Sequence, residues 1–135
     1  MSEPQSEPLG CAVCRAVPAS RDDLRLERVR NLCEAPHEGY AIFRCPECRQ
    51  PFLEQFQEIT WLPSGEDDIW LRWMPVTAEE LAEVERLFPQ ATEDDRDAHD
   101  LASLMHRRGR LVRDPLGRYS WSDQAWDAGN MYPPG

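Results

Sequence analysis

The sequence predicts an α+β fold in which a small antiparallel sheet packs with two or three helices and a C-terminal hairpin. Strand-like segments occupy the middle of the chain, and helix-like segments with apolar residues three or four apart follow them. The chain has 135 residues, of which 41% are hydrophobic and 30% charged, as is usual for a globular domain. We therefore expect a flexible N-terminus over residues 1–9 and a single domain over residues 10–135.

Three segments carry the strand prediction. Tyr40–Arg44 and Phe52–Trp61 flank a pair of cysteines and are rich in aromatic and β-branched residues. In Ile69–Val76 apolar residues occur at both odd and even positions, so both faces of this strand carry apolar bulk. Pro63–Asp68 contains proline, serine and glycine and is typical of a turn. Because both faces of one strand are difficult to bury in a small domain, we expect an exposed tryptophan here, with Trp70 as the candidate.

Helices are predicted over Ser20–Leu32, Ala78–Phe88 and Glu93–Arg108. The first begins with a serine suited to an N-cap, and its apolar residues recur three or four positions apart. Before the second, Thr77 and Glu80 have the spacing of a capping box, in which each side chain accepts the backbone N–H of the other residue. The third has its acidic residues early and its arginines late, which suits the helix macrodipole.

A hairpin is predicted near the C-terminus. Arg110–Arg113 and Tyr119–Trp121 would be its strands, because Asp114–Gly117 has proline and glycine at the positions that a β-turn favours. Ala35–Gly39 is expected to be a loop, and Gly129–Gly135 an irregular tail.

Four of the five cysteines form two C-x-x-C pairs, and thirty residues separate the pairs. A C-x-x-C turn directs both sulfurs and nearby amides at one point, so two such turns can place four thiolates about 2.3 Å from a zinc ion. Two disulfides, a redox pair and bound iron are the alternatives that we weigh against this interpretation. The predicted zinc ligands are Cys11, Cys14, Cys45 and Cys48.

The predicted zinc would have a structural role. A site closed by four thiolates has no open coordination position, so it cannot activate water. Its binding free energy, on the order of 10 kcal/mol in small zinc modules, would hold Gly10–Arg15 against the strands. The fifth cysteine, Cys33, is expected to be a small buried residue, although Cys33 and His37 have the spacing of a substitute ligand pair.

The strand, cysteine turn and strand of Tyr40–Trp61 resemble the zinc-ribbon and rubredoxin-like families, whose second cysteine pair often reads C-P-x-C-G. Here Arg49 occupies the glycine position, and Arg15 follows the first pair. The resemblance implies a sheet built on a zinc-ribbon hairpin. The ribbon would span residues 10–62, and a helical and hairpin part would span residues 63–128.

The chain is acidic, with a formal net charge of −10 and no lysine. Twelve acidic residues against three arginines lie between Glu66 and Asp100, whereas Leu101–Arg118 has five arginines and one aspartate. An acidic surface attracts cationic partners and repels phosphate backbones, so nucleic acid is disfavoured as the main partner. We expect a basic protein partner, and the candidate contact residues are Trp70, Asp67, Asp68, Glu83, Asp94 and Asp95.

Neither catalysis nor membrane insertion is expected. The three histidines, His37, His99 and His106, form no recognised catalytic or metal motif, and no glycine-rich phosphate loop or nucleophile elbow occurs. No apolar run approaches the length that spans a bilayer, and the first residues do not form an export signal. We therefore expect a non-catalytic cytoplasmic protein whose oligomeric state the sequence leaves open.

In size, acidity and paired cysteines, the chain resembles small bacterial immunity proteins that neutralise toxins. The resemblance implies that an acidic surface covers the basic cleft of a toxin. Two alternatives remain open at this point. One is a zinc-ribbon regulator of transcription or translation that uses Arg107–Arg118, and the other is a rubredoxin-like iron electron carrier.

Overall fold

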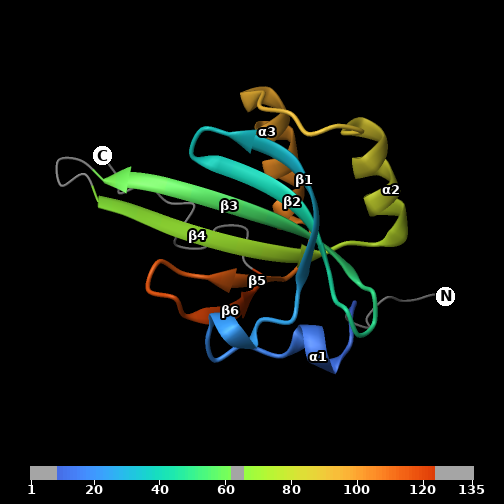
Figure 1. Cartoon of the computed structure of the whole chain (residues 1–135), viewed down its shortest axis with the longest axis vertical. Coiled ribbons are helices and arrows are strands. Elements are labelled where there is room, and N and C mark those ends of the chain that lie inside the picture. Colours follow the sequence, from blue (N-terminus) through green and yellow to red (C-terminus); the bar gives the residue numbers. More distant parts are fainter. Residues whose placement is uncertain (1–8, 62–65, 124–135) are drawn as a thin grey trace.

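A six-stranded antiparallel sheet forms the centre of the fold (Figure 1). The computed structural model describes residues 9–61 and 66–123, apart from the side chains of Trp61 and Glu66. Each strand pairs with the next one along the chain, so the sheet is a meander. The strands are β1 (Glu27–Ala35), β2 (Glu38–Arg44), β3 (Pro51–Trp61), β4 (Glu66–Pro75), β5 (Arg110–Arg113) and β6 (Tyr119–Ser122).

Three α-helices and two 3-10 turns accompany the sheet within the described residues. They are α1 (Ala12–Arg15), η1 (Arg21–Asp23), α2 (Ala78–Leu87), α3 (Asp95–Ala102) and η2 (Ser103–His106). The α+β class and the antiparallel sheet are as predicted. Figure 1 shows α2 and α3 on one side of the central strands, and α1 with β6 on the other.

Two apolar clusters form on opposite faces of the sheet, because successive residues of a strand point to opposite faces. The helix-side cluster consists of Leu32, Cys33, Tyr40, Ile42, Leu53, Met74, Val76, Val84, Phe88, Ala98, Leu101 and Met105. The cysteine-side cluster consists of Cys14, Ala41, Phe43, Cys45, Phe52, Trp73 and Leu111. Strand β4 contributes to both clusters, through Met74 and Trp73 respectively.

The tryptophans of β4 are therefore less exposed than the sequence suggests. Trp73 is only 1% exposed and stacks on Tyr119, with 6.2 Å between the ring centroids. Trp70 is half-buried, and the guanidinium carbon of Arg72 lies 5.3 Å from the centroid of its ring. The second half of β4 is covered on both faces, whereas Trp70 in the first half belongs to neither cluster and keeps part of its surface exposed.

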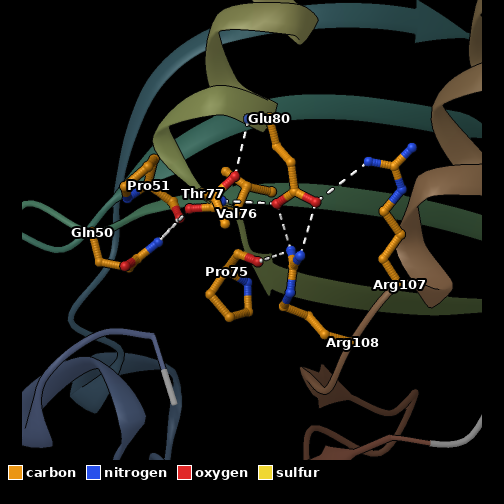
Figure 2. Close-up of polar contacts among 8 residues, drawn as sticks. All are labelled: Gln50, Pro51, Pro75, Val76, Thr77, Glu80, Arg107 and Arg108. Atoms are coloured by element: carbon orange, nitrogen blue, oxygen red, sulfur yellow. Dashed lines mark hydrogen bonds and ion pairs between the residues drawn. The ribbon is translucent and has the colours of Figure 1, made fainter. Parts of the chain in front are cut away.

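Helix α2 begins with the predicted capping box. The Glu80 amide donates to the Thr77 hydroxyl at 3.1 Å, and the Thr77 amide donates to the Glu80 carboxylate at 2.8 Å. The same carboxylate accepts two hydrogen bonds from Arg108, at 2.6 and 2.8 Å, and one from Arg107 at 3.3 Å (Figure 2). Through these bonds the Glu80 carboxylate joins α2 to the segment that enters β5. Arg108 also donates to the Pro75 carbonyl at the end of β4.

The predicted helix over Ser20–Leu32 is wrong. Only η1 is helical there, and the chain then enters β1, which pairs with β2. The pairing skips Val29 and Leu32, so two irregularities interrupt the alternation of the strand. These irregularities place apolar residues three apart, which imitates helical spacing, while Val29 itself remains 47% exposed.

The other predicted elements need smaller corrections. The helix predicted over Glu93–Arg108 divides into α3 and the 3-10 turn η2. The loop expected over Ala35–Gly39 is a tight hairpin turn, with Ala35 already paired to Glu38. Of the turn predicted over Pro63–Asp68, residues 66–68 belong to β4 and residues 63–65 lie outside the described residues. The flexible N-terminus up to residue 8 and the irregular tail over Gly129–Gly135 also lie outside them.

The Glu80 contacts predict a pH-dependent contribution to stability. Burial opposes ionisation of Glu80, but the hydrogen bonds from Arg108 and Thr77 outweigh it and lower the pKa from 4.5 to about 2. E80Q should lower the free energy of unfolding near neutral pH by roughly 2–3 kcal/mol. Because the folded pKa is the lower one, the loss should be complete above about pH 4.5 and shrink as the pH falls toward 2.

Urea unfolding of the wild type and E80Q at a series of pH values measures this difference. E79Q is the matched control, because Glu79 is exposed and makes no ion pair among the described residues. It should change stability by less than about 0.5 kcal/mol. A deficit of E80Q that persists unchanged below about pH 4 would show that packing, and not the charge, is responsible.

Candidate metal centre

The two cysteine pairs come from separate parts of the fold. Cys11 is the N-cap of the single-turn helix α1, and Cys14 lies within that turn. Cys45 and Cys48 lie in the connection between β2 and β3, directly after the pairing of Arg44 with Pro51. The connection closes tightly, because the Cys45 amide donates to the Gln50 carbonyl at 3.0 Å.

The four sulfurs form a compact group. The Sγ atoms of Cys11 and Cys45 are 3.9 Å apart, those of Cys14 and Cys48 are 3.8 Å apart, and all four lie within 4.8 Å of one another. A tetrahedral ion with sulfur ligands at about 2.3 Å requires sulfurs about 3.8 Å apart, so the geometry fits a metal ion. A disulfide needs sulfurs about 2.05 Å apart, so none forms within this group.

Backbone amides support the thiolates of the first pair. The Cys14 amide donates to the Cys11 sulfur, and the Cys11 amide donates to the Cys14 sulfur at 3.2 Å. The first of these bonds is the main reason that the pKa of Cys11 falls to about 7. Burial has the opposite effect on Cys14 and raises the pKa of that thiol to about 12. A bound cation would favour the thiolate form at all four positions, because the ligating species is the thiolate.

The backbone around the sulfurs meets two special demands. Arg49, at the position where related motifs often have glycine, adopts a left-handed conformation with φ of 71°. Gly10 has φ of 95°, and a Cβ atom there would lie only 2.7 Å from the Cys14 sulfur. The position next to the sulfurs that leaves no room for a Cβ atom is therefore Gly10, directly before the first pair. Sequence reasoning did not single out Gly10, although its place directly before a C-x-x-C pair is a visible signal.

Side chains far along the chain fasten this centre to the fold. The Trp121 indole donates to the Arg15 carbonyl at 2.9 Å, and the Arg15 guanidinium lies 4.1 Å from the centroid of the same ring. Gln50 donates to the carbonyls of Pro51 and Val76 at 2.8 and 2.7 Å (Figure 2). The centre thus contacts the last strand as well as the start of α2.

Neither Cys33 nor His37 joins the sulfurs. Cys33 is fully buried in the helix-side cluster, and its thiol contacts the Asp94 carbonyl at 3.7 Å. His37 is exposed in the turn between β1 and β2, where its Nδ1 lies 3.1 Å from the Glu58 carboxylate. Among the described residues, the four cysteines are the one group of three or more histidine, cysteine, aspartate or glutamate side chains placed to hold a metal ion.

The predicted partner-binding residues lie in separate places. Asp67, Asp68 and Trp70 belong to the first half of β4, whereas Glu83 lies on α2, beyond the other end of that strand. A strand of ten residues is roughly 33 Å long, so these two places are well separated. Asp94 caps α3 by accepting the Arg96 amide.

Two hollows lie beside the sheet, and residues of β1 line both of them. One, of about 640 Å³, borders Cys48, Arg49 and the first turn of α2. It is also lined by Leu9, the first residue that the structure describes. The other, of about 440 Å³, lies along β1 and β3 and is lined by Glu54. Sequence reasoning predicted neither hollow, because both depend on the path of β1, which was expected to be a helix.

Removal of one ligand should remove the metal. C45S is expected to lower metal content from one ion per chain to less than 0.1 and to reduce the free energy of unfolding by several kcal/mol, because metal binding at such sites is coupled to folding. Elemental analysis and urea unfolding measure the two effects. C33A is the matched control, since Cys33 is buried but lies outside the sulfur group. A C45S protein with a full metal content and native stability would contradict this assignment.

Gly10 provides a second test. G10A places a methyl group against the Cys14 sulfur and should weaken zinc affinity at least tenfold, as measured by competition with a chelator. G117A is its control, because Gly117 also has a positive φ, of 84°, but its Cβ would meet nothing closer than 3.9 Å. We expect G117A to reduce stability through backbone strain while zinc affinity stays unchanged. Equal losses of affinity in both variants would attribute the effect to strain alone.

Comparison with known proteins does not extend this description. No protein-family model, curated protein or solved structure matches the chain. Within the described residues, no helix is both long and apolar enough to cross a membrane. The feature that bears on function is therefore the site, where four thiols from two turns are arranged as a metal ion with sulfur ligands requires.

Proposed function

We propose that the chain is a non-catalytic interaction protein, stabilised by zinc at the four cysteines, that binds a basic protein partner through acidic residues of α2 and α3. The observation that carries the proposal is the closed group of four sulfurs. Four thiolate ligands occupy every position around a tetrahedral zinc ion and leave none for a substrate. The β2–β3 hairpin with its cysteine turn is the part that would correspond to a zinc ribbon.

The acidic surface supports a cationic partner. Glu79, Glu85, Asp95 and Asp100 are exposed on α2 and α3, and they make no ion pair within the described part of the chain. Such carboxylates attract a basic protein over a distance and accelerate its association at low salt. A toxin with a basic cleft is the partner class that we propose, and neutralisation of that toxin is the corresponding role.

The arginine-rich segment gives less support to nucleic-acid binding. Arg107 and Arg108 pair with Glu80, and Arg118 pairs with Asp114. Arg110 is fully buried. A nucleic-acid surface needs exposed arginines that can reach phosphates, and most of this segment is already engaged within the fold.

Partner capture with charge variants tests the acidic surface. The test variant carries E79Q, E85Q and D100N, and the control carries D22N, E27Q and E47Q, which neutralise three exposed acids outside the two helices. Both sets change the formal net charge from −10 to −7. We expect the wild type and the control to retain the same basic protein from a lysate of the native host, and the test variant to bind it at least tenfold more weakly.

The retained protein is then produced separately, and its affinity and the salt dependence of that affinity are measured by calorimetry. Equal binding by the test and control variants would contradict a role for α2 and α3. Metal analysis and an absorption spectrum address the metal. A protein purified with iron, and showing visible thiolate-to-iron absorption, would instead favour the electron-carrier alternative.

A further inference from the structure

A glutamate is buried in the middle of the sheet, on the face of the cysteine-side cluster. Glu54 of β3 lies between Ala41 of β2 and Trp73 of β4, and its side chain is only 7% exposed. Burial raises the pKa of this carboxyl to about 7, although Arg28 and Trp73 favour the ionised form. A carboxylate in such a position costs stability unless hydrogen bonds replace its hydration.

The fold replaces that hydration poorly. The nearest cation is Arg28, whose Nη2 lies 3.7 Å from the Glu54 Oε1, beyond hydrogen-bond distance, and whose side chain is 54% exposed. The indole N–H of Trp73 acts on this carboxyl only weakly, because its buried Nε1 makes no hydrogen bond of normal length and angle. Among the described residues, Glu54 accepts no hydrogen bond of good geometry. A buried acceptor that the fold leaves under-used calls for an explanation.

The hollow of about 440 Å³ opens beside this carboxylate. Its volume lies within the range of small-ligand sites, roughly 300–1,000 Å³. Phe56 and Leu71 supply apolar walls, and both are only half-buried. Three glutamates border the hollow against one arginine, so its formal charge is negative. These glutamates are Glu34, Glu38 and Glu54.

Arg28 shows what kind of group suits this place. Its guanidinium lies 5.1 Å from the centroid of the Phe43 ring, faces Glu54 and donates to the Asn31 side chain at 2.5 Å. Arg28 itself also lines the hollow, but it does not reach hydrogen-bond distance of the carboxylate. A second guanidinium that enters along Phe56 and Leu71 could make the two parallel hydrogen bonds that an arginine–carboxylate pair favours.

We propose that this hollow binds the guanidinium group of an arginine side chain of a basic protein partner, with Glu54 as the paired carboxylate. The methylene groups of that arginine would lie against Phe56 and Leu71. A planar guanidinium is favoured over the ammonium of lysine, because it matches the carboxylate with two hydrogen bonds and loses less hydration on burial. The site rests on the proposed function for the source of the arginine, but binding of the group itself can be tested alone.

The test is an NMR titration of the zinc-loaded full chain with N-acetyl-arginine N-methylamide. N-acetyl-citrulline N-methylamide, which has a similar shape without the charge, is the control ligand. We expect saturable shifts of the Gly39, Glu54 and Phe56 amides with a dissociation constant on the order of 1 mM, and binding of citrulline at least tenfold weaker. Absence of saturable shifts, or equal binding of citrulline, would overturn the proposal.

Two variants locate the site. E54Q should weaken arginine binding at least tenfold and yet raise the melting temperature near pH 8 by about 5 °C, because a buried charge is removed. R28Q should tighten binding about threefold, because it removes the competing guanidinium. E58Q, on the same strand but outside the hollow, is the matched control and should leave affinity unchanged. Equal affinity of wild type and E54Q would show that the ligand binds elsewhere.

Two further measurements separate the sources of the cation and the two proposals. A ten-residue peptide with one central arginine should bind at least as tightly as the amide. Exclusion of the peptide while agmatine binds would reject a protein arginine in favour of a small guanidine. If the arginine amide binds but the α2 and α3 charge variant loses no partner, the acidic-surface proposal fails while the Glu54 site stands.

Discussion

The four sulfurs meet where the segment that contains Cys11 and Cys14 lies against the turn between β2 and β3, and Cys14 and Cys45 are part of the cluster on that face of the sheet. The segment has little structure of its own, because α1 has four residues and η1 has three. Isolated helices of this length are unstable in water. A metal ion at the sulfurs would supply on the order of 10 kcal/mol, which such a segment cannot obtain from packing alone.

The opposite face is covered in a different way. Helices α2 and α3 bury apolar side chains against Leu53 and Met74, and none of the four grouped cysteines belongs to this cluster. The capping box and the hydrogen bonds between Glu80 and Arg108 hold the first turn of α2 in position. The helix side of the sheet thus depends on hydrophobic packing and an ion pair, whereas the cysteine side combines aromatic packing with the group of four sulfurs.

Two glutamates illustrate how surroundings decide what a charged residue does. Burial acts on both, but Glu80 receives hydrogen bonds from Arg108 and Thr77 and its pKa falls to about 2. Glu54 receives none of comparable quality, and its pKa rises to about 7. The first carboxylate therefore stabilises the fold as an anion. The second is costly as an anion, as is common for groups that bind ligands.

The features that could be predicted from the sequence are those with local signals. The C-x-x-C pairs predict the sulfur group, the Thr77 and Glu80 spacing predicts the cap, and proline with glycine predicts the last hairpin turn. Strand β1 could not be predicted, because its irregular pairing with β2 imitates helical spacing. The surroundings of Glu54 could not be predicted for a related reason, because Arg28, which lies beside it, belongs to β1.

The connectivity of the meander has a consequence for synthesis on the ribosome. Cys11 and Cys45 are 34 residues apart, whereas Arg15 and Trp121 are 106 residues apart. All four cysteines precede β3 in the chain, and each later strand pairs with the one before it. The cysteine group can therefore assemble before the later strands are in place, and the rest of the sheet can be added in chain order. The Trp121 indole, which donates to the Arg15 carbonyl, lies in the last described strand, so this contact forms only after all the earlier strands have been made.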